Sequence, residues 1–366
     1  MMKILFVKHD GVLKSNRRYL EILSERTDWE IHLISPEYWY EPSFRKKFYF
    51  ESSDDSIIKH PVKSFFARHP IFFKYNSKQL TNEIKEINPE VVFISNDPYA
   101  ISAYQAIKGL RDKKIIIYGI QNIKKYIPFP FSSIYRHNLK YCDYFLGCNT
   151  ATLKINQDWG FKGPVDYLPI GIDREHFKKK TNYSLPDIPR IGFVGRVEEI
   201  KGIKYLIRAL NILEFKVKLT VIGEGSQLNW IKENVNKNKI ELIIKSFVSH
   251  NKMPEEYLNL DLLIVPSITI WRWKEQFGRV LVEAMASGVP VIGSDSGAIP
   301  DVLGDAGIIV KERNAEDINR AIKLIVNDED LRIKLIKKGF MRVEKYFFWE
   351  SVADKVINVI EKTMKP

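Results

Sequence analysis

The sequence has 366 residues, of which 45% are hydrophobic and 28% charged, a balance typical of globular proteins with their own cores. This length exceeds what one ordinary core uses, so we expect two domains of similar size. The formal net charge is +12, and the absence of any apolar window of about 18 residues excludes a membrane-spanning helix.

Positive charge is concentrated in the first half of the chain. Residues 59–140 hold 14 basic and 5 acidic side chains. Such a lobe could meet an anionic membrane, a nucleic acid or a phosphorylated acceptor, and a lysine-rich composition without any partner explains it equally well. Because no zinc-finger or aromatic RNA-binding pattern is present, we expect no nucleic acid partner and retain peripheral contact with an anionic membrane.

The N-terminus and the cysteines indicate a cytoplasmic protein. The apolar stretch within residues 1–7 is too short for a signal peptide and predicts a first strand. Cys142 and Cys148 have neither the spacing of a metal site nor a disulfide pattern. We therefore expect a cytoplasmic protein that could associate peripherally with the inner face of the membrane.

Short apolar strands alternate with helical patterns through the first half. The strands are predicted at residues 4–7, 30–35, 91–95, 114–118 and 143–147, and the helices near 18–23, 80–87 and 100–110. Residues 38–73 are predicted to form an aromatic, basic loop. Apolar strands interleaved with helices indicate a parallel sheet covered on both faces, as in a Rossmann-like domain at residues 1–172.

The same alternation restarts after a polar, proline-punctuated segment at 173–189, which we interpret as a linker. Further strands are predicted at residues 190–194, 218–222, 240–244, 262–265, 289–292 and 307–310. They define a second Rossmann-like domain at residues 190–345. Two such domains facing each other leave a cleft at the carboxyl ends of both sheets, where ligands bind in open α/β folds.

Two carboxylates, Glu275 and Glu283, stand eight positions apart after the strand at 262–265. We expect this segment to open a helix, on which the two would lie within roughly 80° of each other, about two turns apart. Spacing alone is typical of solvated surface glutamates. The apolar residues between them, and the glycine stop and buried strand that follow, favour a buried βαβ unit instead. A buried carboxylate needs a partner, and a polar ligand is a natural one.

A strand-to-helix turn carries two cations, Arg196 and Lys201, five positions apart between Gly195 and Gly202. Both side chains can reach one diphosphate, to which backbone N–H groups of the turn also donate. Isolated surface cations would be the alternative interpretation, but the strand, the glycines and the following helical run agree with an anion site.

Two more turns follow neighbouring strands. Gly223 begins a Gly-Glu-Gly turn, which is often only a turn and lacks the third glycine of a dinucleotide fingerprint, so NAD is not expected. The backbone near Val248 ends another strand at the same edge, where it could meet a nucleotide base.

Residues 190–310 resemble the nucleotide-sugar domain of the GT4 family of retaining glycosyltransferases, which have the GT-B fold. The resemblance rests on the turn at 195–202, the Gly-Glu-Gly turn, Pro266-Ser267, the E-x7-E segment 275–283 and the glycine-rich segment 288–297, in the family's order. The first half resembles the family only in architecture. The resemblance implies an acceptor domain at 1–172, a donor domain at 190–345 and a C-terminal helix at 346–366 that crosses back to the first domain.

The resemblance also implies roles for the site residues. Arg196 and Lys201 would hold the donor diphosphate, Glu275 would face the hydroxyls of the donor sugar, and Glu283 those of the ribose. The catalytic candidates are Arg196, Lys201 and Glu275, and the further donor-binding candidates are Gly195, Gly223, Val248, Phe277, Gly278, Arg279, Val280 and Glu283. Because cations and helix N-termini meet the leaving diphosphate in this family, we expect neither a metal nor another cofactor.

The first half departs from the family pattern at the expected sugar contacts. Only Gly11 stands where the family has a glycine-rich loop. The later strands lead to Asn96, Asp97, Gln121 and Asn122 where the family commonly has a histidine. These polar residues could bind the sugar or acceptor, or could be caps and turns.

The segment 268–274, which is long for the family, contains two tryptophans and two cations. It could wall the sugar pocket or simply pack on its neighbour.

We therefore predict a retaining, metal-independent glycosyltransferase of the hexosyltransferase type. Its donor would be a nucleotide-diphosphate sugar, with UDP favoured over GDP, and its acceptor a glycan or lipid-linked molecule in polysaccharide or glycoconjugate biosynthesis. A GT-B-like sugar-nucleotide epimerase or a phosphorylase is the enzyme alternative. A basic nucleic-acid-binding protein is the non-enzyme alternative.

Overall fold

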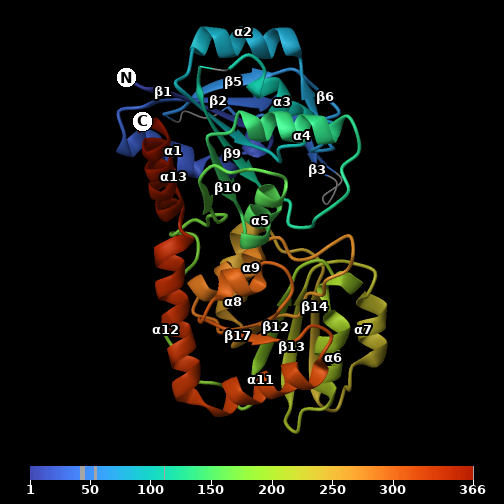
Figure 1. Cartoon of the computed structure of the whole chain (residues 1–366). Coiled ribbons are helices and arrows are strands. Elements are labelled where there is room, and N and C mark those ends of the chain that lie inside the picture. The colour runs from blue at the N-terminus through green and yellow to red at the C-terminus, as the bar shows by residue number, and fades with distance from the viewer. Residues whose placement is uncertain (42–45, 53–55, 111, 366) are drawn as a thin grey trace. The chain divides into compact units, whose positions relative to one another are not determined.

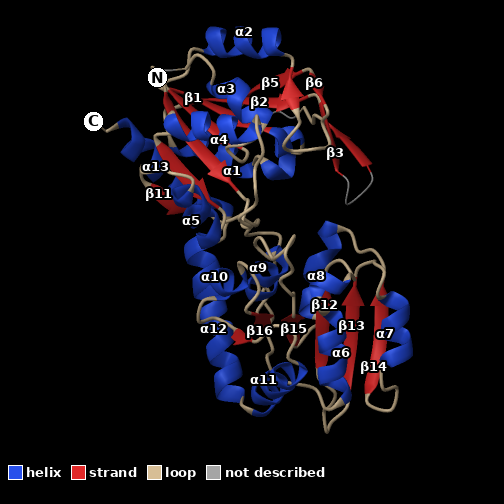
Figure 2. Cartoon of the chain, turned by 45° about the vertical axis from the view of Figure 1, so that its right-hand side comes forward, coloured by secondary structure: helices blue, strands red, loops and turns tan. Residues whose placement is uncertain are grey.

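The chain forms two compact units in a computed structural model that describes residues 1–41, 46–52, 56–110 and 112–365. The first unit comprises Met1–Pro169 together with Trp349–Pro366, and the second comprises Ile170–Phe348. Each unit has its own parallel sheet, as Figure 2 shows by the strands in red. No helix in these described ranges is long and apolar enough to cross a membrane.

The first unit is built on a parallel sheet with the strand order β11-β10-β9-β8-β1-β2-β5. The strands are β1 (Lys3–Lys8), β2 (Glu30–Pro36), β5 (Ile58–Val62), β8 (Val91–Ser95), β9 (Lys114–Gly119), β10 (Tyr144–Gly147) and β11 (Val165–Tyr167). The inner strands are nearly continuous buried apolar runs, because helices cover both faces. The outer strands β5 and β11 extend the sheet beyond the predicted strands.

Helices cover this sheet, and the C-terminal helix is one of them. The helices are α1 (Arg18–Arg26), α2 (Ser77–Ile87), α3 (Ile101–Ile107), α4 (Phe131–Lys140), α5 (Thr150–Asp158) and α13 (Trp349–Met364), with short 3-10 turns η1 (His9–Val12) and η2 (Lys14–Asn16). The rings of Tyr19 and Trp349 stack with centroids 5.8 Å apart, and Arg26 pairs with Asp354. The last helix therefore packs on α1 within the first unit (Figure 1).

The predicted loop at 38–73 contains regular structure in its described part. It holds β5 and the hairpin strands β3 (Tyr38–Glu41), β4 (Lys46–Tyr49) and β6 (Ser64–Phe65), and β6 pairs with β7 (Lys74–Tyr75). Trp39, Phe73 and Tyr75 are buried in the core of the unit. Basic residues between these aromatics obscure the alternation that predicts a strand.

The second unit is built on a parallel sheet with the order β14-β13-β12-β15-β16-β17. The strands are β12 (Arg190–Val194), β13 (Val217–Ile222), β14 (Ile240–Lys245), β15 (Leu262–Val265), β16 (Val291–Ser294) and β17 (Ile308–Val310). All six coincide with predicted strands to within a few residues. Strands β13 and β14 lie on one side of β12, and β15 to β17 lie on the other. The loops that follow β12 and β15 therefore lead to opposite sides of the sheet, which opens a crevice at the carboxyl ends of these two strands.

The helices of this unit flank the sheet (Figure 2). They are α6 (Ile203–Asn211), α7 (Leu228–Asn234), α8 (Met253–Leu258), α9 (Arg279–Ala286), α10 (Ile299–Leu303), α11 (Ala315–Asn327) and α12 (Glu329–Tyr346), with 3-10 turns η3 (Glu199–Lys201) and η4 (His250–Lys252). Residues 173–189, interpreted above as a linker, lie within the second unit. Phe177 is buried in its core, and Lys180 Nζ pairs with Asp261 at 3.2 Å.

Candidate functional site

A cavity of about 190 Å³ lies at the crevice of the second unit, where the loops after β12 and β15 diverge. Its lining residues are Phe193, Val194, Gly195, Arg196, Lys201, Val265, Ser267, Glu275, Gly278, Arg279 and Val280. It brings together most of the residues that the sequence indicates for donor binding. Gly223, Val248, Phe277 and Glu283 are not among the lining residues.

Glycine lets the loops around the cavity approach at backbone contact. Gly202 has φ +70°, and a Cβ there would lie 1.8 Å from the carbonyl oxygen of Pro266. Gly223 has φ +140°, and a Cβ there would lie 2.0 Å from the carbonyl oxygen of Gly195. Gly223 therefore shapes the site by packing behind Gly195 rather than by lining the cavity.

Lys201 and Glu275 form an ion pair at the cavity wall. Lys201 Nζ lies 2.6 Å from Glu275 Oε2, to which the Ser267 hydroxyl also donates at 3.0 Å. The ring centroid of Trp273 lies 4.7 Å from the same Nζ, which adds a cation–π contact. Glu275 and Ser267 are buried, so the carboxylate is held on several sides.

The expectation that Glu275 and Glu283 share one face of a helix is wrong. Helix α9 begins at Arg279, and Gly278, with φ +83°, precedes it in the left-handed region that stops a helix from extending toward the N-terminus. Glu275 therefore lies in the loop before α9. Its carbonyl accepts from the N–H of Ala298 at 2.9 Å.

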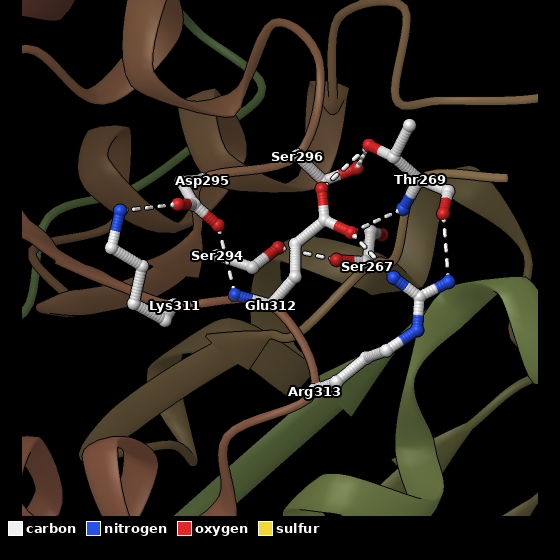
Figure 3. A network of polar contacts seen from close by, with 8 residues as sticks. All are labelled: Ser267, Thr269, Ser294, Asp295, Ser296, Lys311, Glu312 and Arg313. Carbon is white, nitrogen blue, oxygen red and sulfur yellow. Dashed lines mark hydrogen bonds and ion pairs between the residues drawn. The ribbon is translucent and has the colours of Figure 1, made fainter.

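A polar network anchors the loop that carries Ser267 and Glu275 (Figure 3). The Glu312 carboxylate accepts from the N–H of Thr269 at 2.6 Å and from its hydroxyl at 2.5 Å. Arg313 Nη2 donates to the carbonyl of Thr269 at 2.8 Å, and the Ser296 hydroxyl lies 3.0 Å from the Thr269 hydroxyl. Every polar group of Thr269 is thus bonded to residues that follow β16 and β17.

The same network reaches the residue that touches Glu275. The Ser294 hydroxyl donates to the carbonyl of Ser267 at 2.5 Å. Asp295 accepts from the N–H of Glu312 at 2.8 Å and pairs with Lys311 at 3.0 Å (Figure 3). The carboxyl ends of three adjacent strands, β15, β16 and β17, are therefore tied together beside the cavity.

Two guanidinium groups at the cavity remain available to a ligand. Arg196 and Arg279 are exposed, and neither has an ion-pair or hydrogen-bond partner among the described residues. Helix α9 begins at the cavity with Arg279 and Val280, and the first N–H groups of a helix have no partner within it. The cavity therefore combines two unpaired cations with a positive helix end, an arrangement suited to an anion.

Glu283 lies on α9 in a buried setting of its own. The Tyr257 hydroxyl donates to Glu283 Oε2 at 2.6 Å. Burial raises the pKa of Glu283, although Tyr257, Arg279 and His176 oppose the shift. The rings of His176 and His250 stack nearby at 4.5 Å, and His176 Nε2 donates to the carbonyl of His250 at 3.0 Å.

Several residues that shape the site carry no sequence signal of their own. Tyr257 and Glu312 belong to ordinary amphipathic or turn segments, and His176 lies in the segment interpreted as a linker. In the long segment 268–274, Trp273 packs on Lys201, as described above. Trp271 is 76% exposed, with the Arg272 guanidinium 3.8 Å from its ring centroid.

The candidates of the first unit lie at the carboxyl ends of β1, β8 and β9. Asp97 accepts from the N–H groups of Ile120 and Gln121 at 2.9 and 3.0 Å, and burial raises its pKa. Asn96 donates to the Ser102 hydroxyl at 2.9 Å. These contacts are those of turn residues and bring Asp97 and Gln121 together.

The two remaining candidates of this unit are buried. Asn122 is 2% exposed. A Cβ on Gly11 would lie 2.5 Å from the Ser35 hydroxyl oxygen, which explains a glycine there by close packing.

The chain resembles known proteins both in sequence and in fold. Residues 173–342 match the family model described as Glycosyl transferases group 1. The chain is 31% identical to an uncharacterized 41.2 kDa protein in the cps region of Klebsiella pneumoniae, over 83% of this chain and 84% of that protein. It is 32% identical to the capsular polysaccharide biosynthesis glycosyltransferase CapM of Staphylococcus aureus, over 53% of this chain and 52% of CapM. Among solved structures, Anabaena Alr3699/HepE in complex with UDP matches with a TM-score of 0.70 and 14% identity, over 99% of this chain and 100% of that one.

The structural likeness confirms the predicted α/β GT-B fold with two Rossmann-like domains. The chain spans about half the length of several curated relatives that it matches. The Klebsiella match covers most of both chains, and the family model covers the residues that build the cavity. The chain therefore belongs to the family of glycosyl transferases group 1.

Proposed function

We propose that the protein is a retaining glycosyltransferase that transfers a sugar from a nucleotide-diphosphate sugar, with UDP favoured over GDP, to a glycan or lipid-linked acceptor. One observation carries the proposal: the Lys201–Glu275 pair stands in a cavity beside two unpaired guanidiniums and the start of α9. CapM acts in capsular polysaccharide biosynthesis and the Anabaena protein is in complex with UDP, which supports this choice of donor and acceptor.

The charges of the cavity suit a diphosphate. Glu275 neutralises Lys201, so the positive charge left for a ligand is that of Arg196, Arg279 and the N-terminus of α9. A hydrogen bond to a charged group is worth about 1.5–3 kcal/mol. The same groups would stabilise the charge that develops on the departing nucleotide, so we propose transfer without a metal.

The two glutamates would then contact different parts of the donor. A carboxylate can accept about four hydrogen bonds, so Glu275 can receive a sugar hydroxyl in addition to Lys201 and Ser267. Lys201 would lie between this carboxylate and the diphosphate and would screen their repulsion. Glu283, on the next turns of α9, would meet the ribose, with Tyr257 fixing its orientation.

Three measurements test this function. A panel of nucleotides and nucleotide sugars should raise the melting temperature by mass action, most strongly for uridine diphosphate compounds. UDP release should require an acceptor and survive EDTA, and NMR of the product should show the anomeric configuration of the donor. Turnover of the nucleotide sugar without any acceptor would instead indicate the epimerase alternative, and loss of activity in EDTA would contradict transfer without a metal.

A further inference from the structure

Two segments of the first unit, residues 63–75 and 120–131, combine exposed aromatic rings with basic side chains and contain no Asp or Glu. We call them together the basic aromatic surface. Their exposed rings are those of Phe65, Phe66, Phe72, Tyr126 and Phe129, with exposed fractions of 42%, 64%, 46%, 91% and 81%. Exposed apolar residues are ordinary when scattered, but a cluster of large rings marks an interaction site.

Both segments begin at the carboxyl ends of strands of the same sheet. Residues 63–75 follow the carboxyl end of β5, and residues 120–131 follow that of β9. The ring of Phe72 contacts that of Phe131 edge-on, with centroids 5.4 Å apart. The two segments are therefore in contact with each other in the folded unit.

Only part of the positive charge of this surface is neutralised by the described residues: Lys124 pairs with Asp158 at 3.3 Å. Arg68, Lys74 and Lys125 form no ion pair with any carboxylate in the described part of the chain. Lys74 Nζ lies 5.9 Å from the ring centroids of both Phe65 and Phe66, so charge and rings are interleaved. A partner for this surface must offer negative charge to the cations and, beside it, an apolar layer to the rings.

We propose that the basic aromatic surface binds an anionic lipid bilayer. The rings enter the boundary between headgroups and acyl chains, and the cations meet the lipid phosphates. Phenylalanine predominates among the rings and has no polar group to satisfy, which favours an apolar layer over the stacked bases of a nucleic acid. The proposal does not depend on sugar transfer, since vesicle binding is measured without a substrate.

The test is flotation of the full chain with vesicles of phosphatidylcholine alone or mixed with phosphatidylglycerol. We expect binding only to the anionic vesicles, and weaker binding at high salt. Each basic residue near an anionic surface contributes about fivefold, so Lys74→Gln with Lys125→Gln should weaken binding about 25-fold. Phe66→Ser with Phe129→Ser should also weaken it, while thermal unfolding stays unchanged because both rings are exposed.

Matched controls lie in the second unit. Phe247→Ser removes a ring that is 75% exposed, and Lys232→Gln with Lys237→Gln removes two exposed cations, and both variants should bind vesicles normally. Equal binding to neutral vesicles, or equal loss in the controls, would overturn the proposal. So would a loss that follows the lysines but not the phenylalanines, or binding of single-stranded RNA through the same residues without vesicle binding.

Discussion

Lys201 Nζ lies 2.6 Å from Glu275 Oε2, although 74 positions separate the two residues in the sequence. Lys201 ends the turn after β12, and Glu275 lies in the loop after β15. The pair therefore links the segments that follow two adjacent strands, on either side of which the chain adds strands in opposite directions. The side chains are 18% and 9% exposed, which makes each dependent on the other for compensation of its charge.

Breaking this pair from either side should therefore have unequal consequences. Lys201→Met leaves a buried carboxylate without its cation, and we expect a loss of about 3 kcal/mol in unfolding free energy, with loss of turnover. Glu275→Gln keeps an acceptor for Lys201 and Ser267 and should lose turnover with a smaller change in stability. Urea unfolding and UDP release measure the two effects.

The control for this prediction is an exposed pair in the same unit. Lys323 pairs with Glu214 at 2.7 Å, with side chains 31% and 80% exposed. Lys323→Met should change stability by less than about 1 kcal/mol and leave turnover intact. Wild-type turnover in Lys201→Met would show that the pair is structural and not part of a donor site.

A second prediction concerns Glu312, which bonds Thr269 in the loop that leads to Glu275. Glu312→Ala should lower kcat/KM by up to about 100-fold, because a displaced catalytic group loses its alignment. UDP affinity should fall less than turnover, since Arg196 lies on the separate turn after β12 and Arg279 lies on helix α9. Isothermal titration measures the affinity for UDP, and steady-state kinetics measure kcat/KM.

The coupling between Glu312 and Glu275 decides whether Glu312 acts through that carboxylate. Combined with Glu275→Gln, Glu312→Ala should add no further loss of turnover, because residues that act as a unit are not additive. Lys311→Ala removes only the exposed ion pair with Asp295 and should behave like the wild type. Additive losses in the double variant would refute a positioning role.

A third prediction opposes stability and function at Glu283. Burial raises the pKa of this carboxyl, so the charged form is disfavoured in the folded protein. Its folded pKa exceeds the unfolded value, and stability is therefore lost as the pH rises through the folded pKa. Glu283→Gln keeps an acceptor for Tyr257 without the charge and should raise the melting temperature at neutral pH but not in acid.

The same variant should bind the nucleotide more weakly, because a carboxylate is the stronger acceptor for ribose hydroxyls. Thermal scans across pH measure the change in stability, and titration with UDP measures the change in nucleotide affinity. A variant that gained stability and kept its affinity would show that Glu283 does not contact the ligand.

The sequence predicts the fold well, because the buried strands of a parallel sheet are continuous apolar runs that can be recognised without knowledge of tertiary contacts. Arg196, Lys201 and Glu275 are predicted as site residues because glycine-bounded turns and family spacing mark them. The helix geometry of Glu275 is predicted wrongly, since Gly278 breaks the helix pattern and only its φ of +83° reveals this. Glu312 could not be predicted, because its contact with Thr269 spans 43 positions and exists only once β15 and β17 are placed in one sheet.

A final prediction concerns Asp261, which holds the start of the second unit together. Its carboxylate accepts from Arg190 Nη2 at 2.6 Å and Nε at 2.9 Å, and pairs with Lys180 at 3.2 Å. Burial alone would raise the pKa of Asp261, but the hydrogen bonds from Arg190 and the charge of Lys180 hold it below its ordinary value of 3.8. The stabilisation is therefore present above that value and lost as the pH falls through the folded pKa.

Asp261→Asn should consequently cost about 3–5 kcal/mol of unfolding free energy at neutral pH, because it leaves two cations facing a neutral amide. The difference between variant and wild type should shrink as the pH falls from 3.8, the ordinary value of the unfolded chain, through the lower folded pKa at which the native carboxyl becomes protonated. Urea midpoints at neutral and acidic pH measure both quantities. A difference that is the same at every pH would mean that Asp261 acts through packing and hydrogen bonds alone, and not through its charge.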